Sequence, residues 1–217
     1  MKIQSTESYG GMLNQDELAQ RYSYMDARIT YGYTEEEVSF LMGRPPYYFS
    51  DYERMEGKTR LTQQDIEILA RIFEGHRFAE ICFAKDEFFA YHEKRLIRVK
   101  KEVRGNLLSY TLMHPWEIKK NKVKRQEPIR FQELIRKQSN GDEIKIKEEI
   151  SYVLKRLLCR GFFCTAQLPY AIYAEVAKLA SRNRSIYPAS LKEVLYAYLH
   201  RGELILRTTN GLMHYSH

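Results

Sequence analysis

Long apolar runs are missing from this chain of 217 residues. No stretch approaches the roughly 20 apolar residues that a membrane-spanning helix needs, so we expect no membrane partner. The first residues, MKIQSTESYGG, are polar and lack the apolar core of a secretion signal. Hydrophobic residues make up 44% and charged residues 29% of the chain, which is typical of a soluble globular protein.

Cysteine is scarce, and the cysteines present form no CxxC pair. The chain has three, Cys82, Cys159 and Cys164. An odd number without metal-ligand spacing favours buried, reduced thiols over a disulfide framework or a zinc site. We therefore expect a location in the reducing cytoplasm.

Catalytic signatures are also missing. The sequence contains no GxSxG, no HExxH, no phosphate-binding glycine loop and no acidic metal cluster. The six histidines are scattered, and His214 with His217 supplies only two ligands at a chain end. We expect no enzyme, no catalytic residue, no metal and no cofactor.

The net charge of +7 is distributed unevenly along the chain. Residues 1–75 hold 8 Lys and Arg against 13 Asp and Glu, whereas residues 76–217 hold 27 against 15. Residues 94–137 alone hold 14 basic against 4 acidic side chains, a net charge of +10. A segment this basic predicts a polyanion as partner.

The stretch YTEEEVSFLMGRPPYYFSDYE at 33–53 has the pattern of a helix-turn-helix. Thr34 and Glu37 have the spacing of a capping box, in which each side chain bonds the backbone of the other. Gly43 supplies the turn, and Pro46 suits the first turn of a second helix because that position needs no N–H. Outward-facing residues of a second helix enter the DNA major groove in this architecture.

Caps, apolar periodicity and turn residues predict the remaining elements. Asn14 and Gly32 bound one helix, Thr62 begins another that Gly75 stops, and Asn210-Gly211 is the turn of a terminal hairpin. The expected elements are helices at 14–31, 62–75, 142–161, 169–180 and 188–200, and β-hairpins at 94–113 and 202–217. Residues 114–140 are expected to be a disordered or partly helical linker.

These elements predict a mainly α fold with small β content. We expect an N-terminal helix-turn-helix domain of four or five helices, a central β-hairpin and a C-terminal winged-helix-like domain. The expected boundaries are 12–75 for the helix-turn-helix domain, 76–113 for an aromatic segment and basic hairpin, 114–140 for the basic linker and 141–217 for the winged-helix-like domain. The hairpin would carry Arg98, Lys100 and Arg104 on its outer side.

Residues 14–75 resemble the phage-repressor-like (Xre/Cro) helix-turn-helix family. The matching residues are Thr34, Glu36, Glu37, Val38, Leu41 or Met42, Gly43, Ser50, Tyr52 and Glu53, with ILARIFE at 68–74 as the closing helix. The resemblance implies a bacterial regulator that pairs this domain with a C-terminal partner or sensing domain. It places the DNA-reading positions at Glu35, Arg44, Pro46, Tyr47, Tyr48, Ser50 and Asp51.

Two functions follow from these observations. The first is a sequence-specific regulator of transcription that binds double-stranded DNA as a homodimer, because one short recognition helix gives little affinity. Its expected DNA-binding residues are Arg44, Tyr47, Tyr48, Ser50, Arg54, Lys58, Arg60, Lys119, Lys120, Lys122, Lys124 and Arg125. The alternative is a protein-interaction adaptor in which both domains serve as docking surfaces, without direct DNA readout; a protein partner could bind through the C-terminal domain. The acidic character of residues 1–75 is the reason for that alternative.

Overall fold

The computed structural model describes residues 4–55, 59–78, 80, 81, 83, 93–120, 123–136, 140–180 and 186–217. They fall into two compact units that are discontinuous in sequence. Unit 1 comprises Met1–Gly32, Ser50–Arg60 and Gly75–Arg136, and unit 2 comprises Tyr33–Phe49, Leu61–Glu74 and Lys137–His217. None of the helices in the described ranges has both the length and the hydropathy needed to cross a bilayer.

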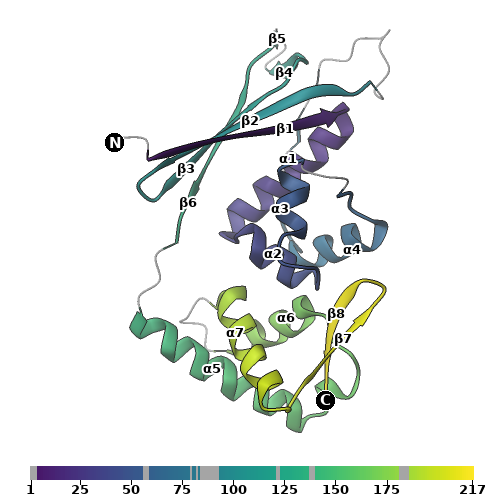
Figure 1. The fold of residues 1–217 in the computed structure, drawn as a ribbon, viewed down its shortest axis with the longest axis vertical. Helices are drawn as coiled ribbons and strands as arrows, with labels where there is room; N and C mark the ends of the chain where they lie inside the picture. Colours follow the sequence, from purple (N-terminus) through teal and green to yellow (C-terminus); the bar gives the residue numbers. More distant parts are fainter. Residues whose placement is uncertain are drawn as a thin grey trace. The chain divides into compact units, whose positions relative to one another are not determined.

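A four-stranded antiparallel sheet organises unit 1 (Figure 1). Its strands, in spatial order, are β1 (Ser5–Leu13), β2 (Arg95–Arg104), β3 (Leu107–Met113) and β6 (Ile129–Leu134). β2 and β3 form a hairpin through Gly105, whose φ of 66° suits glycine. Two shorter strands, β4 (Ile118–Lys120) and β5 (Val123–Arg125), pair separately as an antiparallel ribbon.

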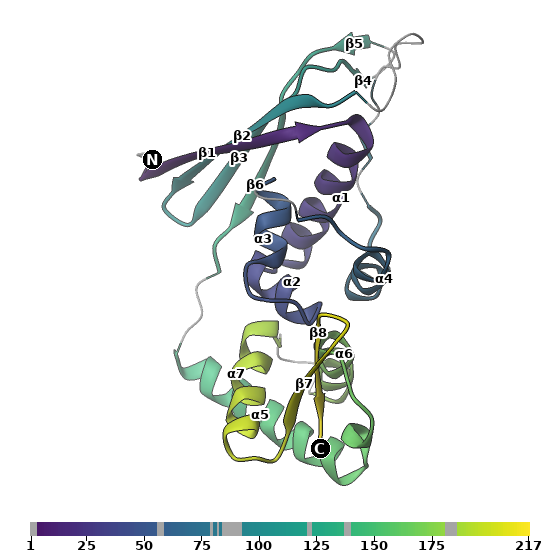
Figure 2. The same cartoon turned by 45° about the vertical axis from the view of Figure 1, so that its right-hand side comes forward.

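Helix α1 (Gln15–Tyr31) packs beneath this sheet (Figure 2). The inner face of the sheet and one stripe of α1 share a core made of Leu13, Leu18, Met25, Ile97, Val99, Tyr110 and Leu112. The helix begins with a capping box between Asn14 and Glu17 and ends at Gly32 in the left-handed region. One face of the sheet is therefore covered, and the other is left to solvent.

Arg28 forms the central polar contact of unit 1. Its side chain is fully buried, and its guanidinium donates to both carboxylate oxygens of Glu53, at 2.9 and 3.2 Å. It also donates to both oxygens of Glu133, at 3.0 and 3.2 Å. The Tyr110 hydroxyl donates to Glu133 at 2.8 Å. One arginine thus joins α1 to the end of α3 and to two strands of the sheet.

Unit 2 is mainly helical. It contains α2 (Glu35–Leu41), α4 (Gln63–Ile72), α5 (Asn140–Cys159), a 3₁₀ turn η1 (Phe162–Cys164), α6 (Pro169–Leu179), α7 (Pro188–His200) and the hairpin β7 (Ile205–Thr209) and β8 (Leu212–Ser216). Helix α2 contacts both α6 and α7. The short helix α3 (Tyr48–Glu53) is divided between the two units.

The expected fold class is wrong. The chain opens with strand β1 and builds a four-stranded antiparallel sheet, so it does not begin with a four- or five-helix domain. The range 114–140, expected to be a linker, contains β4, β5 and β6, and β6 completes that sheet. Strand pairing between distant segments decided this outcome, and local periodicity does not report such pairing.

The local elements agree better with the sequence. The helix caps at Asn14 and Thr62, the capping box of Thr34 with Glu37 and the hairpin turn at Asn210 and Gly211 are confirmed. The expectation of buried thiols is wrong for Cys159 and Cys164, which are exposed. Both stand at the ends of short apolar runs, where the sequence does not reveal which side faces solvent. Cys82 and most of the aromatic segment at 76–90 lie outside the described residues.

Arg28→Met should lower the free energy of unfolding by about 3–5 kcal/mol, because it leaves two carboxylates buried without their cation. Arg28→Lys should also destabilise, since an ammonium cannot form two forked pairs at once. Urea unfolding followed by circular dichroism measures both effects. The control is Arg54→Lys, at an exposed pair with Glu7 that is worth at most about 1 kcal/mol. A loss below that value for Arg28→Met would contradict the role assigned to this arginine.

Candidate nucleic-acid interface

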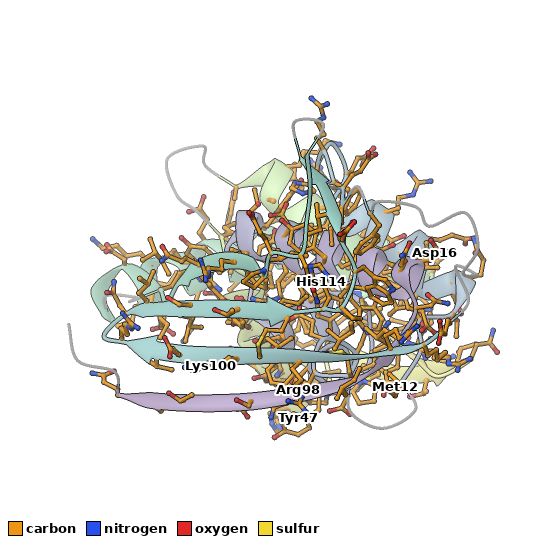
Figure 3. The ribbon with its side chains drawn as sticks, turned by 90° about the horizontal axis from the view of Figure 1, so that it is seen from above. Met12, Asp16, Tyr47, Arg98, Lys100 and His114 are labelled. Atoms are coloured by element: carbon orange, nitrogen blue, oxygen red, sulfur yellow. The ribbon has the colours of Figure 1, made fainter. Side chains whose placement is uncertain are left out.

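The uncovered face of the four-stranded sheet carries a basic row beside exposed apolar side chains. The apolar side chains are Met12, Leu96, Met113 and Leu134, each at least 45% exposed. Because side chains alternate along a strand, the buried Ile97 and Val99 place Arg98 and Lys100 on the opposite, outer face. Figure 3 looks onto this face and labels Met12, Arg98 and Lys100 on it. The strand register aligns one row across all four strands, namely Ser8, Lys100, Thr111 and Arg130.

Four cations and one carboxylate belong to this outer face. Lys100 and Arg104 both bond Glu102, at 2.6 and 2.9 Å, and these hydrogen bonds lower the pKa of the Glu102 carboxyl. Arg98 and Arg130 are exposed and form no ion pair with any residue that the structure describes. The outer face therefore presents at least two cations that are available to an anion.

Gly10 keeps the backbone accessible next to Arg98, its partner in the strand register. A Cβ atom built on Gly10 would lie 2.2 Å from the carbonyl oxygen of Ile97, so no other residue fits without a backbone shift. Neutral hydroxyl and amide groups flank the cations, and they are Thr6, Ser8, Ser109, Thr111 and Gln132. Hydroxyls and amides of this kind commonly share phosphate contacts with Lys and Arg.

Arg44, expected to contact DNA, is engaged within unit 2. Its Nε donates to Asp65 at 2.8 Å, and its Nη1 donates to the carbonyl oxygen of Gly211 in the β7–β8 turn at 3.0 Å. Gly43, the expected turn residue, accepts a hydrogen bond from the Met213 amide at 2.7 Å. The turn between α2 and α3 is thus paired with the backbone of β8.

Tyr48 is engaged by the same carboxylate. Its hydroxyl donates to Asp65 at 2.8 Å, and burial together with that bond raises the pKa of Tyr48 to about 12. Asp65 is itself buried and caps α4 by accepting from the Thr62 amide. Burial alone would raise the pKa of Asp65, but hydrogen bonds from Arg44, Thr62 and Tyr48 lower it. Arg44 and Tyr48 therefore both bond Asp65 within unit 2, and these contacts account for the presence of the two side chains.

The other expected DNA-binding residues are scattered. Tyr47 is 75% exposed, and Ser50 is half-buried. Arg54 pairs with Glu7, and its guanidinium lies 5.3 Å from the centre of the Tyr9 ring. Arg60 lines a cavity of unit 1. The β4–β5 ribbon contains Lys119 and Lys120 on β4 and Lys124 and Arg125 on β5. Lys58 and Lys122 lie outside the described residues.

The glutamates at the start of α2 have partners in unit 2. Glu37 accepts from the Thr34 amide at 2.8 Å and from the Ala189 amide at the start of α7, at 3.2 Å. Glu36 pairs with Lys192. Two of the carboxylates that make residues 1–75 acidic therefore serve helix capping and helix contacts, as their position at a helix N-terminus favours.

Sequence reasoning had placed Arg98, Lys100 and Arg104 on the outer side of a hairpin, but it missed what completes the surface. Ser8 comes from a segment that was assigned no structure, and Arg130 from the expected linker. The alternation of IRFQEL in β6 was the available signal, since Ile129, Phe131 and Glu133 are less exposed than the residues between them.

Arg44→Ala should destabilise the protein by about 3 kcal/mol, because Asp65 would stay buried without its cation. Arg44→Ala with Asp65→Asn should recover part of this loss, since the uncompensated charge is then gone. Thermal and urea unfolding of both variants measure the coupling. If Arg44 instead serves DNA alone, Arg44→Ala will unfold like the wild type and lose only DNA affinity.

Comparison of the chain with protein-family models, with curated proteins and with solved structures gave no match.

Proposed function

We propose that this chain is a DNA-binding regulator that holds the phosphate backbone on the outer face of its four-stranded sheet. The observation that carries the proposal is the pair Arg98 and Arg130, two exposed cations without a carboxylate partner among the described residues. They lie on the part of the chain with the largest basic excess, the net +10 of residues 94–137. The expected location in a bacterial cytoplasm, and a homodimer, belong to the same proposal.

The spacing of the cations suits a duplex. Strands of a sheet are about 4.8 Å apart, so Lys100 on β2 and Arg130 on β6 are separated by two such steps, about 10 Å. A DNA duplex carries roughly six negative charges over that length of its axis. Several phosphates can therefore face the sheet at once, which is what nonspecific affinity requires.

Base reading by Arg44 and Tyr48 is not part of the proposal, because Asp65 and Gly211 hold those side chains. β-Strands of other proteins contact base edges in the major or the minor groove of DNA. The hydroxyls and the amide beside the cations can donate hydrogen bonds to phosphates or base edges. A dimer would place two such faces on one duplex and raise the affinity of a surface that is small by itself.

Arg98→Gln with Arg130→Gln should weaken DNA binding and reduce its salt dependence. Each phosphate contact contributes about 0.9 to the slope of log K against log salt concentration, so the double variant should lose roughly 1.8 from that slope. Fluorescence anisotropy with a labelled duplex, repeated across a salt series, measures both quantities.

A matched control removes the same charge elsewhere. Arg71→Gln with Lys155→Gln changes two exposed cations on α4 and α5, outside the sheet, and should leave the slope unchanged. Equal slopes for the two double variants would contradict the proposed surface, and the absence of any salt-dependent duplex binding by the wild type would overturn the function.

A second candidate, a protein-interaction adaptor, is favoured by a groove in unit 2. The groove has a volume of about 350 Å³ and lies along α2 and α7, where Glu36, Glu37, Glu193, Phe40 and Tyr196 line it. Carboxylates beside two aromatic rings suit a basic segment with an apolar side chain. Lys192 is the cation among the described lining residues, and it is paired with Glu36, while Glu193 is paired with Lys147.

Selection of a random peptide library on the intact chain tests this candidate. We expect enrichment of peptides with Lys or Arg next to an apolar residue, and loss of their binding by at least about tenfold in Tyr196→Ala with Glu193→Gln. Tyr152→Ala is the control, an exposed tyrosine on α5 outside the groove. Enriched peptides without basic residues, or equal binding to both variants, would count against the adaptor.

A further inference from the structure

We propose that unit 1 carries a binding site for a small organic anion, which is distinct from the outer face of the sheet and independent of DNA binding. The site is a cavity of about 410 Å³ at the junction of β1 and α1. Among the described residues that line it, three side chains are cationic, Arg21, Arg60 and Lys94, and one is a carboxylate, Glu17. An anion is the ligand that this charge balance selects.

Arg21 is the central residue of the site. It is only 9% exposed, and among the described residues no carboxylate forms an ion pair with it. Its Nε donates to the Tyr52 carbonyl oxygen and its Nη1 to the Glu17 carbonyl oxygen, both at 3.2 Å. A guanidinium has five N–H groups, so donors remain for a ligand.

The orientation of Arg21 is fixed before any ligand arrives. Besides the two carbonyl contacts, its guanidinium carbon lies 4.5 Å from the centre of the Tyr52 ring. A guanidinium that is already fixed by two hydrogen bonds and one ring contact loses little further conformational freedom when a ligand binds, and this lowers the entropic cost of the complex. Burial lowers the pKa of Arg21, as does the nearby charge of Arg60, and a bound anion would offset both effects.

Lys94 and Glu17 form the second polar part of the cavity. The Lys94 ammonium donates to Glu17 Oε1 at 2.9 Å, while Glu17 Oε2 accepts from the Asn14 amide in the capping box. Glu17 is therefore occupied on both oxygens, whereas Lys94 has two further N–H donors for a ligand. A phosphate or carboxylate bound between Arg21 and Lys94 would have donors from two sides.

The rest of the lining is apolar and strained. Leu13 and Met55 contribute apolar surface, which suits a ligand with a hydrocarbon body behind its charged group. Met55 has a φ of 59°, a conformation that costs a residue with a Cβ roughly 1 kcal/mol or more. A Cβ on Gly11 would come within 2.8 Å of the Met55 Cβ, so glycine is required where the strand meets this residue. Strained backbone of this kind gathers at ligand sites.

Four probes test the site on the full chain: n-hexyl phosphate, hexanoate, inorganic phosphate and 1-hexanol. Isothermal titration calorimetry at constant ionic strength should give saturable binding of hexyl phosphate or hexanoate, weaker binding of inorganic phosphate and none of 1-hexanol. The tighter of the first two identifies the charged group of the natural ligand. Equal binding of 1-hexanol, or no saturation by either organic anion, overturns the proposal.

Two substitutions on one ion pair should change the affinity in opposite directions. Lys94→Gln should weaken binding of the better anion by at least about tenfold, because it removes a donor and leaves Glu17 facing the ligand. Glu17→Gln should strengthen it, since the repulsive charge is gone while glutamine still completes the capping box. Both variants must keep the wild-type circular dichroism spectrum and unfolding midpoint within a few degrees.

Arg98→Gln with Arg130→Gln separates this site from the proposed DNA surface. That variant should bind hexyl phosphate as the wild type does, even where duplex binding is lost. If Lys94→Gln and Glu17→Gln shift the affinity in the same direction, or if the sheet variant abolishes anion binding, the cavity is not the site.

Discussion

The buried guanidinium of Arg28 is the contact on which unit 1 depends. Two carboxylates, Glu53 and Glu133, share it in forked geometry, and Tyr110 completes the second of them. Burying three charges costs several kcal/mol per ion unless every donor and acceptor finds a partner in good geometry. The cluster therefore accepts one arrangement of α1, α3 and β6, and a shift of β6 by one residue would turn Glu133 to the outer face. The basic row on that face exists because this register is held.

The charge that this protein presents at its surface depends on which charged side chains are already bonded within the fold. Residues 1–75 are acidic by sequence, and that excess argued against DNA binding by this part of the chain. In the folded chain Glu37 and Asp65 bond helix N-termini and Glu53 bonds Arg28, so none of these is an exposed single charge. A charge bonded in the interior contributes little field at the surface. The basic excess of residues 94–137 includes Arg98 and Arg130, which form no ion pair with any described residue. Arg28 and Arg44, the partners of Glu53 and Asp65, belong to the same segment, so the net charge of residues 1–75 changes little when these pairs are set aside.

How far the sequence predicted the fold depends on the range of the interactions. The cap at Asn14, the capping box of Thr34 with Glu37 and the turn at Asn210 and Gly211 need only neighbours in sequence, and they were predicted correctly. Strand β1 was missed because its STESYGGML sequence is polar and rich in glycine, with little apolar alternation. It becomes a strand by pairing with β2, some ninety residues away. The use of Arg44 was missed for the same reason, since its partners Asp65 and Gly211 are distant in sequence and a charged turn residue looks solvent-exposed.

Strand β1 belongs to both surfaces inferred for unit 1. Its outward residues Ser8 and Gly10 lie beside the cations of the sheet, while Gly11 and Leu13 line the cavity with Arg21. Two sites that share a strand are not coupled for that reason alone. A ligand at one site changes the affinity of the other site only if the ligand binds two conformations of the protein with different affinities. Met55, with its φ of 59°, lies against Gly11, so a change of that φ would move the backbone next to β1. Linkage is reciprocal, so an anion that altered duplex affinity through this contact would have its own affinity altered by DNA by the same factor.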